Sequence, residues 1–219
     1  CLDDLACNYN PIVVVDDESC IYPEQGLDCN GNELAQYQVG DFAEGGIVFY
    51  VDETGEHGLV AAMEDLEEIY EWGCYGTSIS GADGLAIGTG LQNTLDIVAG
   101  CSHTNTAAFN ALNATIEVYT DWYLPSKDEL VEMYNTIGNG GPEGNIGGFE
   151  MSDYPYYWSS SENNKNNAWN VNFNNGNTNN NNKNNTNRVR DIRASLTKAK
   201  ALPHWWGLFY YPTVIPHCL

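Results

Sequence analysis

Residues 157–193 read YWSSSENNKNNAWNVNFNNGNTNNNNKNNTNRVRDIR, and this segment decides the fold of the chain. Sixteen of the twenty-five positions from 163 to 187 are Asn, yet Trp169, Val171 and Phe173 recur at every second place. Side chains two apart on a β-strand share a face. The pattern therefore predicts a strand whose inward face carries these three apolar side chains.

The Asn residues between these anchors, Asn170, Asn172 and Asn174, are then expected to point outward. A bare Asn-rich tract is usually disordered or prone to aggregation. Here aromatic and β-branched residues precede, interrupt and follow the run. Disordered tracts contain few such residues, because they do not pack into a core. We therefore predict an ordered ribbon that displays carboxamides.

The abundance of Asn needs a cause other than folding, because Asn is depleted in strands. Asn codons carry adenine at their first two positions, so a mutator acting on adenines could convert each into most other side-chain classes without creating a stop codon. The segment resembles the variable region of proteins diversified by bacterial and phage retroelements, in which a template copy dense in Asn codons rewrites the 3′ end of a gene. The resemblance implies that the variable, ligand-binding positions are Asn163, Asn164, Asn166, Asn167, Asn170, Asn172, Asn174, Asn175, Asn177, Asn179, Asn180, Asn181, Asn182, Asn184, Asn185 and Asn187.

The charge of the chain is unevenly distributed. Residues 1–126 contain no Lys or Arg and twenty-two Asp or Glu, whereas residues 127–219 carry eight of each sign, so the net charge of −22 lies in the first part. Such a surface repels phosphate and anionic headgroups, so we expect no nucleic-acid partner. No apolar run is long enough to span a bilayer, which predicts no direct membrane span. The chain lacks an initiator Met and a signal sequence, and we expect a mature form or a fragment.

Seven Cys and no CxxC pair indicate an oxidising compartment, so the protein is expected to be secreted or at the cell surface. We expect a disulfide between Cys74 and Cys101. Four further cysteines cluster at the start of the chain and one is left over near its end: Cys1, Cys7, Cys20, Cys29 and Cys218.

Residues 1–30 are too few to build a core and would need disulfides, a metal or both. They resemble a short Cys-rich repeat of secreted bacterial proteins, usually C-T-D-x-x-A-C-N-Y-N-P followed by D-D-G-S-C. Cys1 could alternatively be the acylated first residue of a lipoprotein. The same segment carries oxygen ligands that could bind calcium: Asp3, Asp4, Asp16, Asp17 and Asn8. A solvated acidic loop is the more common explanation of such a cluster. Calcium is the one cofactor that the sequence suggests.

The remaining helices and strands are predicted from hydrophobic periodicity and from the turn-forming residues between them. A linker at 31–36 precedes a hairpin of strands 47–51 and 59–63, a short acidic helix at 64–72, a Gly-rich loop at 81–90, and helices at 91–99 and 106–116. A strand at 122–126 is followed by a helix that runs to residue 137 and opens with a capping box, in which Ser126 and Glu129 take the key positions.

The body also resembles a known family. The segments GGIVFYVD, HGLVAA, EWGCYGT, IGTGLQNT, DIVAGC, DWYLPSKDEL, GGF, YWSSSE, AWNVNF and RVRDIR occur in the order and spacing of the Lcl C-terminal domain family, a domain of bacterial surface proteins. The resemblance implies an α+β, C-type-lectin-like domain over 37–195, related to formylglycine-generating enzymes, with two main helices, short antiparallel strands and a variable region at 157–194. Residues 196–219 depart from the family and form an atypical tail, read either as an extra strand or as frameshifted or read-through sequence.

No catalytic constellation is apparent in the sequence, so we expect the protein not to be an enzyme. The four His residues lack HExxH or HxH spacing, and the Ser cluster at 159–161 has no GxSxG elbow. The oxidase among the fold relatives holds copper with a cysteine pair in the C-terminal region, where neither Cys74 nor Cys101 lies.

The first functional hypothesis is a secreted or surface-attached variable protein that uses its Asn face to bind a protein or carbohydrate on another cell or surface. The alternative is an invariant bacterial adhesin for polysaccharide or matrix, in which Asn amides bond sugar hydroxyls and aromatic rings stack on them. An oxidase-like enzyme is the third and least supported hypothesis.

Overall fold

The computed structural model describes residues 6–10, 12, 19–22, 27, 29–31, 37–55, 57–152 and 154–196. The calcium ligands predicted at Asp3, Asp4, Asp16 and Asp17 lie outside these residues, as does the predicted tail beyond Leu196. The chain divides into two units, and the one spanning Gln36–Thr197 contains every helix and strand named below. None of the helices in the described residues is long and apolar enough to cross a membrane.

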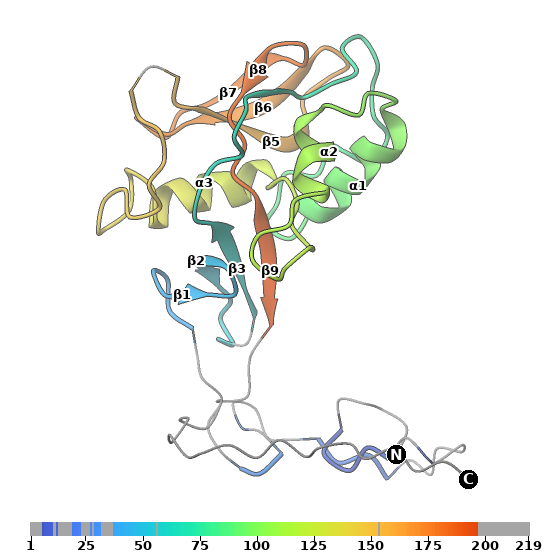
Figure 1. Cartoon of the computed structure of the whole chain (residues 1–219), viewed down its shortest axis with the longest axis vertical. Helices are drawn as coiled ribbons and strands as arrows, with labels where there is room; N and C mark the ends of the chain where they lie inside the picture. The colour runs from blue at the N-terminus through green and yellow to red at the C-terminus, as the bar shows by residue number, and fades with distance from the viewer. Residues whose placement is uncertain are drawn as a thin grey trace, which may run out of the picture. The chain divides into compact units, whose positions relative to one another are not determined.

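A four-stranded antiparallel sheet joins the two ends of this unit. Its strands, in the order β1 (Phe42–Ala43), β2 (Gly46–Val51), β3 (His57–Ala62) and β9 (Ile192–Leu196), confirm the predicted hairpin and add a partner from the far end of the sequence (Figure 1). A Cβ on Gly46 would lie 2.0 Å from the carbonyl oxygen of Ala61. Only glycine therefore allows β2 and β3 to approach this closely.

The described residues of the unit form three helices, near the positions predicted from periodicity, whereas the family resemblance implied two main helices. They are α1 (Gly90–Gly100), α2 (Ala107–Leu112) and α3 (Lys127–Thr136). Helix α2 ends well before residue 116, because Ile116 instead pairs with Tyr119 in a tight turn.

The predicted capping box opens α3. The Ser126 hydroxyl accepts from the Glu129 backbone N–H at 3.3 Å, and the Ser126 N–H donates to the Glu129 carboxylate at 2.6 Å. Glu129 also accepts from the Gly88 N–H at 2.8 Å, which ties the Gly-rich loop to the helix. Burial raises the pKa of the Glu129 carboxyl, and these backbone hydrogen bonds oppose the shift.

The short acidic helix predicted at 64–72 is wrong. The segment is extended, and its β4 strand (Tyr70–Glu71) pairs with β8 (Thr186–Asn187). The Leu66 N–H donates to the Val189 carbonyl at 3.0 Å, so the segment bonds to the Asn-rich part of the chain instead of to itself. This long-range pairing overrides the local helical pattern. The strand predicted at 122–126 is reduced to a single bridge between Tyr123 and Ile192.

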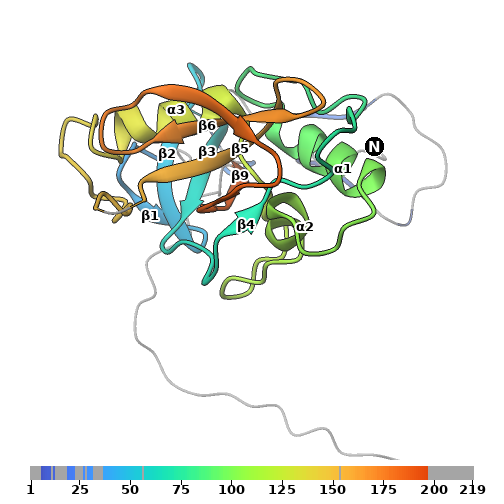
Figure 2. The same cartoon turned by 90° about the horizontal axis from the view of Figure 1, so that it is seen from above.

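Helix α3 lies between the four-stranded sheet and a second sheet of three strands, in the order β5 (Tyr156–Glu162), β6 (Asn167–Asn172) and β7 (Thr178–Asn182) (Figure 1 and Figure 2). Leu130 and Met133 of α3 are fully buried there. A second cluster lies on the α1 and α2 side and includes Trp72, Ile97 and Trp158. Strands β5 and β6 of the three-stranded sheet are therefore packed against apolar side chains on both of their faces.

The described part of the N-terminal segment has its own cross-links. A disulfide joins Cys7 to Cys29. The Asn8 side chain accepts from the Ile21 N–H at 2.9 Å and donates to the Ser19 carbonyl at 2.6 Å. Asn8, considered above as a calcium ligand, thus connects two stretches of backbone.

Candidate functional site

The Asn-rich ribbon, residues 163–187, is ordered β-structure. Strand β6 forms the centre of its sheet, with β5 antiparallel on one side and β7 antiparallel on the other. Pairing of Trp169 with Asn180 and of Val171 with Thr178 sets the register of the last two strands. The ribbon thus continues a sheet whose first strand, β5, contains the YWSSSE motif.

The inward face predicted for the ribbon is confirmed at two of its three positions. Val171 and Phe173 are fully buried beside Tyr157, and the Phe173 ring lies 4.6 Å from the Tyr157 ring centroid to centroid. Trp169 is only half-buried, and the Lys127 ammonium lies 5.7 Å from the centroid of its ring. The apolar alternation therefore anchors the ribbon on the α3 side.

The outward orientation predicted for Asn170 is wrong, and Asn187, one of the expected ligand-binding positions, is buried as well. Asn170 is 1% exposed and Asn187 is 0% exposed. Asn170 pairs with Trp158 across β5 and β6, next to the second apolar cluster, so the face opposite Val171 is covered as well. The prediction failed because it assumed that one face of the sheet is exposed to solvent, whereas β5 and β6 are packed on both faces.

The remaining Asn residues divide by exposure. Half-buried positions are Asn166, Asn167, Asn172 and Asn181. The exposed set, by which we mean the Asn residues whose side chains are open to solvent, comprises Asn163, Asn164, Asn174, Asn175, Asn177, Asn179, Asn180, Asn182, Asn184 and Asn185. The exposed set therefore lies mainly on β7 and on the turns at either side of β6.

Several of these side chains hold turns. Asn164, Asn172 and Asn175 each accept a hydrogen bond from the backbone N–H two residues further on, at 2.9, 2.8 and 3.0 Å respectively. This is the Asx-turn geometry that favours Asn in tight connections. By contrast, the side chains of Asn180 and Asn182 make no hydrogen bond to any described residue, and they are free for a ligand.

A buried cation fixes the ribbon to the rest of the unit. The Lys183 ammonium is ion-paired with Glu162, donates to the Thr77 carbonyl at 2.9 Å and lies 4.4 Å from the centroid of the Trp72 ring. The Glu162 carboxylate in turn accepts from the Ile79 N–H at 3.0 Å. This role was not predicted from the sequence, in which Lys183 is one of two Lys residues within the run of amides.

The RVRDIR motif that follows the ribbon carries a second charged network. Arg190, 1% exposed, pairs with Asp65 at 2.7 Å, and the Tyr157 hydroxyl donates to the same carboxylate at 2.8 Å. Next to it, Asp191 is also 1% exposed, and neither of its carboxylate oxygens has a hydrogen-bond partner among the described residues. Burial raises the pKa of Asp191 to about 7, with Arg190 opposing and Asp65 reinforcing the shift.

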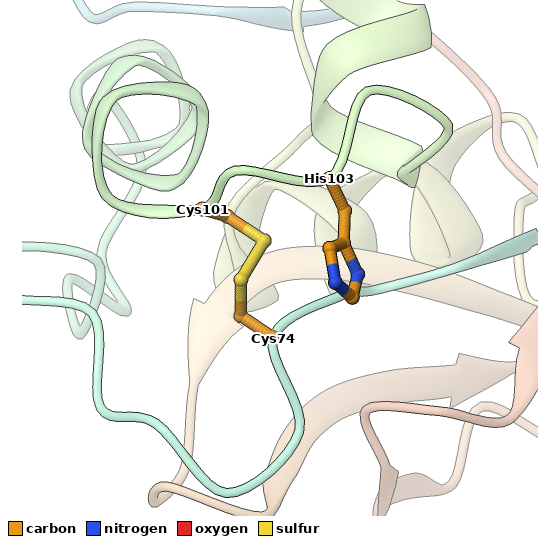
Figure 3. A group of neighbouring side chains, drawn as sticks. All are labelled: Cys74, Cys101 and His103. Atoms are coloured by element: carbon orange, nitrogen blue, oxygen red, sulfur yellow. A yellow bond between two sulfur atoms is a disulfide. The ribbon is translucent and has the colours of Figure 1, made fainter.

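The predicted disulfide between Cys74 and Cys101 is present. His103 lies beside it, and these three residues form the group of potential metal ligands found among the described residues (Figure 3). Metal binding by cysteine requires a thiolate, and both sulfur atoms are here committed to the disulfide. The group therefore serves as a cross-link at the base of the 102–106 loop.

The comparison with known families agrees with the motifs from residue 74 onward, whereas the GGIVFYVD and HGLVAA segments lie before the matched range. The family model described as the Lcl C-terminal domain matches residues 74–193, which is more than half of the chain. A search of curated proteins found no significant match. The matched range includes the capping box of α3, the YWSSSE strand, the whole Asn-rich ribbon and the buried Arg190. The chain therefore belongs to the Lcl C-terminal domain family.

Proposed function

We propose that the protein is a secreted or surface-attached binding protein whose ligand site is the exposed set of Asn residues, diversified by a retroelement. One observation carries the proposal: exposed amides sit on a ribbon that is itself fixed by buried side chains. Val171, Phe173 and Lys183 hold the ribbon in place, while Asn180 and Asn182 on the same ribbon are exposed. A rigid scaffold that presents replaceable side chains is how binding surfaces are generally built.

The chemistry of the ribbon supports a template rather than a matured binding site. A carboxamide is both a donor and an acceptor of hydrogen bonds, so an Asn surface stays well hydrated and has little preference for any one partner. Binding energy at interfaces is concentrated in Tyr, Trp and Arg. We therefore expect this chain to bind weakly, and variants that gain such residues in the exposed set to bind tightly to a protein or carbohydrate on another surface.

The two buried Asn residues refine the set of useful variable positions. Replacement of Asn170 or Asn187 by a large side chain would have to displace packed neighbours, because neither is exposed. We propose that functional variants keep small residues at these two positions even where the copying process alters them. Binding rather than catalysis is the proposed activity, and no cofactor is assigned to it.

The fold and location form part of the same proposal. We propose a C-type-lectin-like arrangement, supported by antiparallel sheets and by the pairing of β3 with β9, which brings the two ends of the domain together. The Cys7–Cys29 and Cys74–Cys101 disulfides support an extracellular location.

The alternative, an invariant adhesin for polysaccharide, is favoured by one pair of rings. Tyr154 is 37% exposed, and its ring makes an edge contact with that of Tyr156 at 5.4 Å. Tyr156 pairs directly with Asn172, so aromatic and amide groups adjoin at the edge of the ribbon. This combination suits the stacking and hydrogen bonding of a sugar.

The DNA beside the gene separates the two proposals. Diversification requires a near-identical repeat of the ribbon codons that differs at adenines, together with a reverse-transcriptase gene nearby. An isolated gene with no such repeat would favour the adhesin.

A display library tests the site itself. Adenines in the codons of the exposed set are randomised, and binders are selected against a panel of surface proteins and glycans. A matched library randomises as many exposed positions in the 75–88 segment. Our proposal predicts specific binders from the ribbon library at a much higher frequency; equal frequencies from both libraries would refute the site assignment.

A further inference from the structure

A pocket of about 520 Å³ lies beside strands β4 and β8, outside the exposed set of Asn residues. Tyr70 and Glu71 of β4 and Thr186 of β8 line one part of it. His103, Thr104 and Asn105, from the loop before α2, line another part. None of the sixteen Asn positions of the ribbon contributes to the lining, and Thr186 is the ribbon residue that does, so most of the pocket lies outside the ribbon.

The walls of this pocket are held by backbone pairing and a disulfide. Tyr70 pairs with Asn187 and Glu71 with Thr186, and Glu71 also bridges to Thr106. The loop begins directly after Cys101, which is bonded to Cys74 (Figure 3). These constraints form the pocket before any ligand arrives, which lowers the entropic cost of binding.

The loop side of the pocket is held by a further contact. The Asn110 side chain donates to the Asn105 side-chain oxygen at 3.2 Å and to the Thr106 carbonyl at 2.9 Å. The Asn105 amide nitrogen makes no hydrogen bond to a described residue and remains available as a donor. The exposed Thr104 hydroxyl and His103 ring flank it.

The lining chemistry selects a class of ligand. The pocket offers hydroxyl, amide, imidazole and carboxylate groups together with the Tyr70 ring, and its volume lies in the range of small-molecule sites. A ligand with many hydroxyl groups and a small apolar face uses all of these groups at once.

The negative charge around the pocket further restricts the class of ligand. Glu71 lines the pocket. Burial raises the pKa of the Tyr70 hydroxyl, and the negative charges of Glu68 and Glu67 nearby raise it further. No Lys or Arg is among its described lining residues. The local field therefore disfavours uronic acids and sulfated sugars.

We propose that this pocket binds a neutral monosaccharide or the end of a neutral glycan. Its lining includes none of the variable Asn positions, and of the described lining residues only Thr186 belongs to the ribbon, so changes at the Asn positions leave the lining residues unaltered. The proposal does not depend on the ribbon being diversified.

Saturation-transfer NMR on the full chain tests the site with methyl glycosides of glucose, galactose and mannose as probes, and methyl glucuronide as the charged match. At least one neutral glycoside is expected to bind, and glucuronide to bind more weakly. Asn105→Ala and Glu71→Gln should each weaken binding roughly fivefold, the effect of losing one hydrogen bond. Ser78→Ala, which is exposed and outside both the pocket and the ribbon, should leave binding unchanged. Asn180→Ala tests whether the sugar lies on the ribbon instead, and thermal melts check that every variant is folded.

Four results would overturn the proposal. The first is no saturation transfer to any neutral glycoside. The second is binding that survives both pocket variants, and the third is glucuronide binding as strongly as its neutral match. Loss of binding in Asn180→Ala with retention in Asn105→Ala would place the sugar on the ribbon instead, which also contradicts this pocket.

Discussion

Lys183 and Glu162 form a buried ion pair that joins the Asn-rich ribbon to the end of β5. Their side chains are 0% and 7% exposed. Burial lowers the pKa of the Lys183 ammonium, and the Glu162 carboxylate opposes that shift. The ribbon is therefore positioned by a charged residue that lies within the run of amides and is not itself displayed.

Lys183→Met is expected to destabilise the fold by about 3–5 kcal/mol, because it leaves the Glu162 carboxylate buried without its partner. Lys165→Met is the matched control: Lys165 is the other Lys of the ribbon and is exposed, so its loss should cost less than about 0.5 kcal/mol. The double variant Lys183→Met/Glu162→Gln should recover part of the lost stability. Guanidinium unfolding measures all three, and equal effects of the two single Lys variants would contradict the anchoring role.

The same Asn→Tyr substitution at an exposed and at a buried position of the ribbon should have different effects on the free energy of unfolding. Asn180→Tyr should change the free energy of unfolding by less than about 0.5 kcal/mol, because Asn180 is exposed. Asn170→Tyr should cost about 1–3 kcal/mol or more, because Asn170 is 1% exposed and a larger side chain overpacks the sheet. Thermal melts of both variants measure the two changes in stability. Equal tolerance at the two positions would mean that the ribbon is not packed as described.

Asp191 is predicted to make stability depend on pH. Its pKa in the folded state is raised to about 7 from 3.8, so between about pH 4 and pH 7 the folded state binds more protons than the unfolded state. The free energy of unfolding therefore falls as the pH rises through this window, and the penalty is fully present above it.

Asp191→Asn removes that penalty. At about pH 8 the variant should be more stable than the parent by up to about 4 kcal/mol, since one pH unit of pKa displacement corresponds to about 1.4 kcal/mol. Near pH 4 the two should be similar. Urea unfolding across this range checks the prediction, with the exposed Asp83→Asn as control. A constant difference between parent and variant at every pH would contradict it.

The Cys74–Cys101 disulfide closes a long loop, and its removal should cost about 3 kcal/mol. The Cys74→Ala/Cys101→Ala variant should also weaken glycoside binding, because the pocket loop begins at Cys101. Differential scanning calorimetry and the NMR titration measure the two effects. An unchanged melting temperature would show that the cross-link adds little to the folded state.

Much of the fold could be predicted because its signals are local. The Ser126 and Glu129 capping box is encoded within four residues and opens α3 as expected. Alternation at Val171 and Phe173 likewise predicted the face that packs on α3. The 64–72 segment was misjudged because its hydrogen-bond partners, such as Val189, lie more than a hundred residues away in the sequence.

The candidate site was only partly predictable for a related reason. Alternation identifies two faces of a strand but not whether the second face is covered, so the burial of Asn170 and Asn187 could not be foreseen. The ion pair of Lys183 with Glu162 and that of Arg190 with Asp65 depend on tertiary packing. The pocket beside β4 is assembled from three separate segments, none of which carries a motif of its own.

The central claim is that the Asn-rich ribbon is a folded surface, and amide hydrogen exchange tests it most directly. Strand β6 is paired on both sides, so the amides of residues 168–171 should exchange roughly a thousandfold or more slowly than in an unfolded peptide. Amides in the turn at 174–177 should exchange faster. Exchange throughout 168–171 at the rate of an unfolded peptide would contradict the account, because no rigid surface would then exist to carry a binding site.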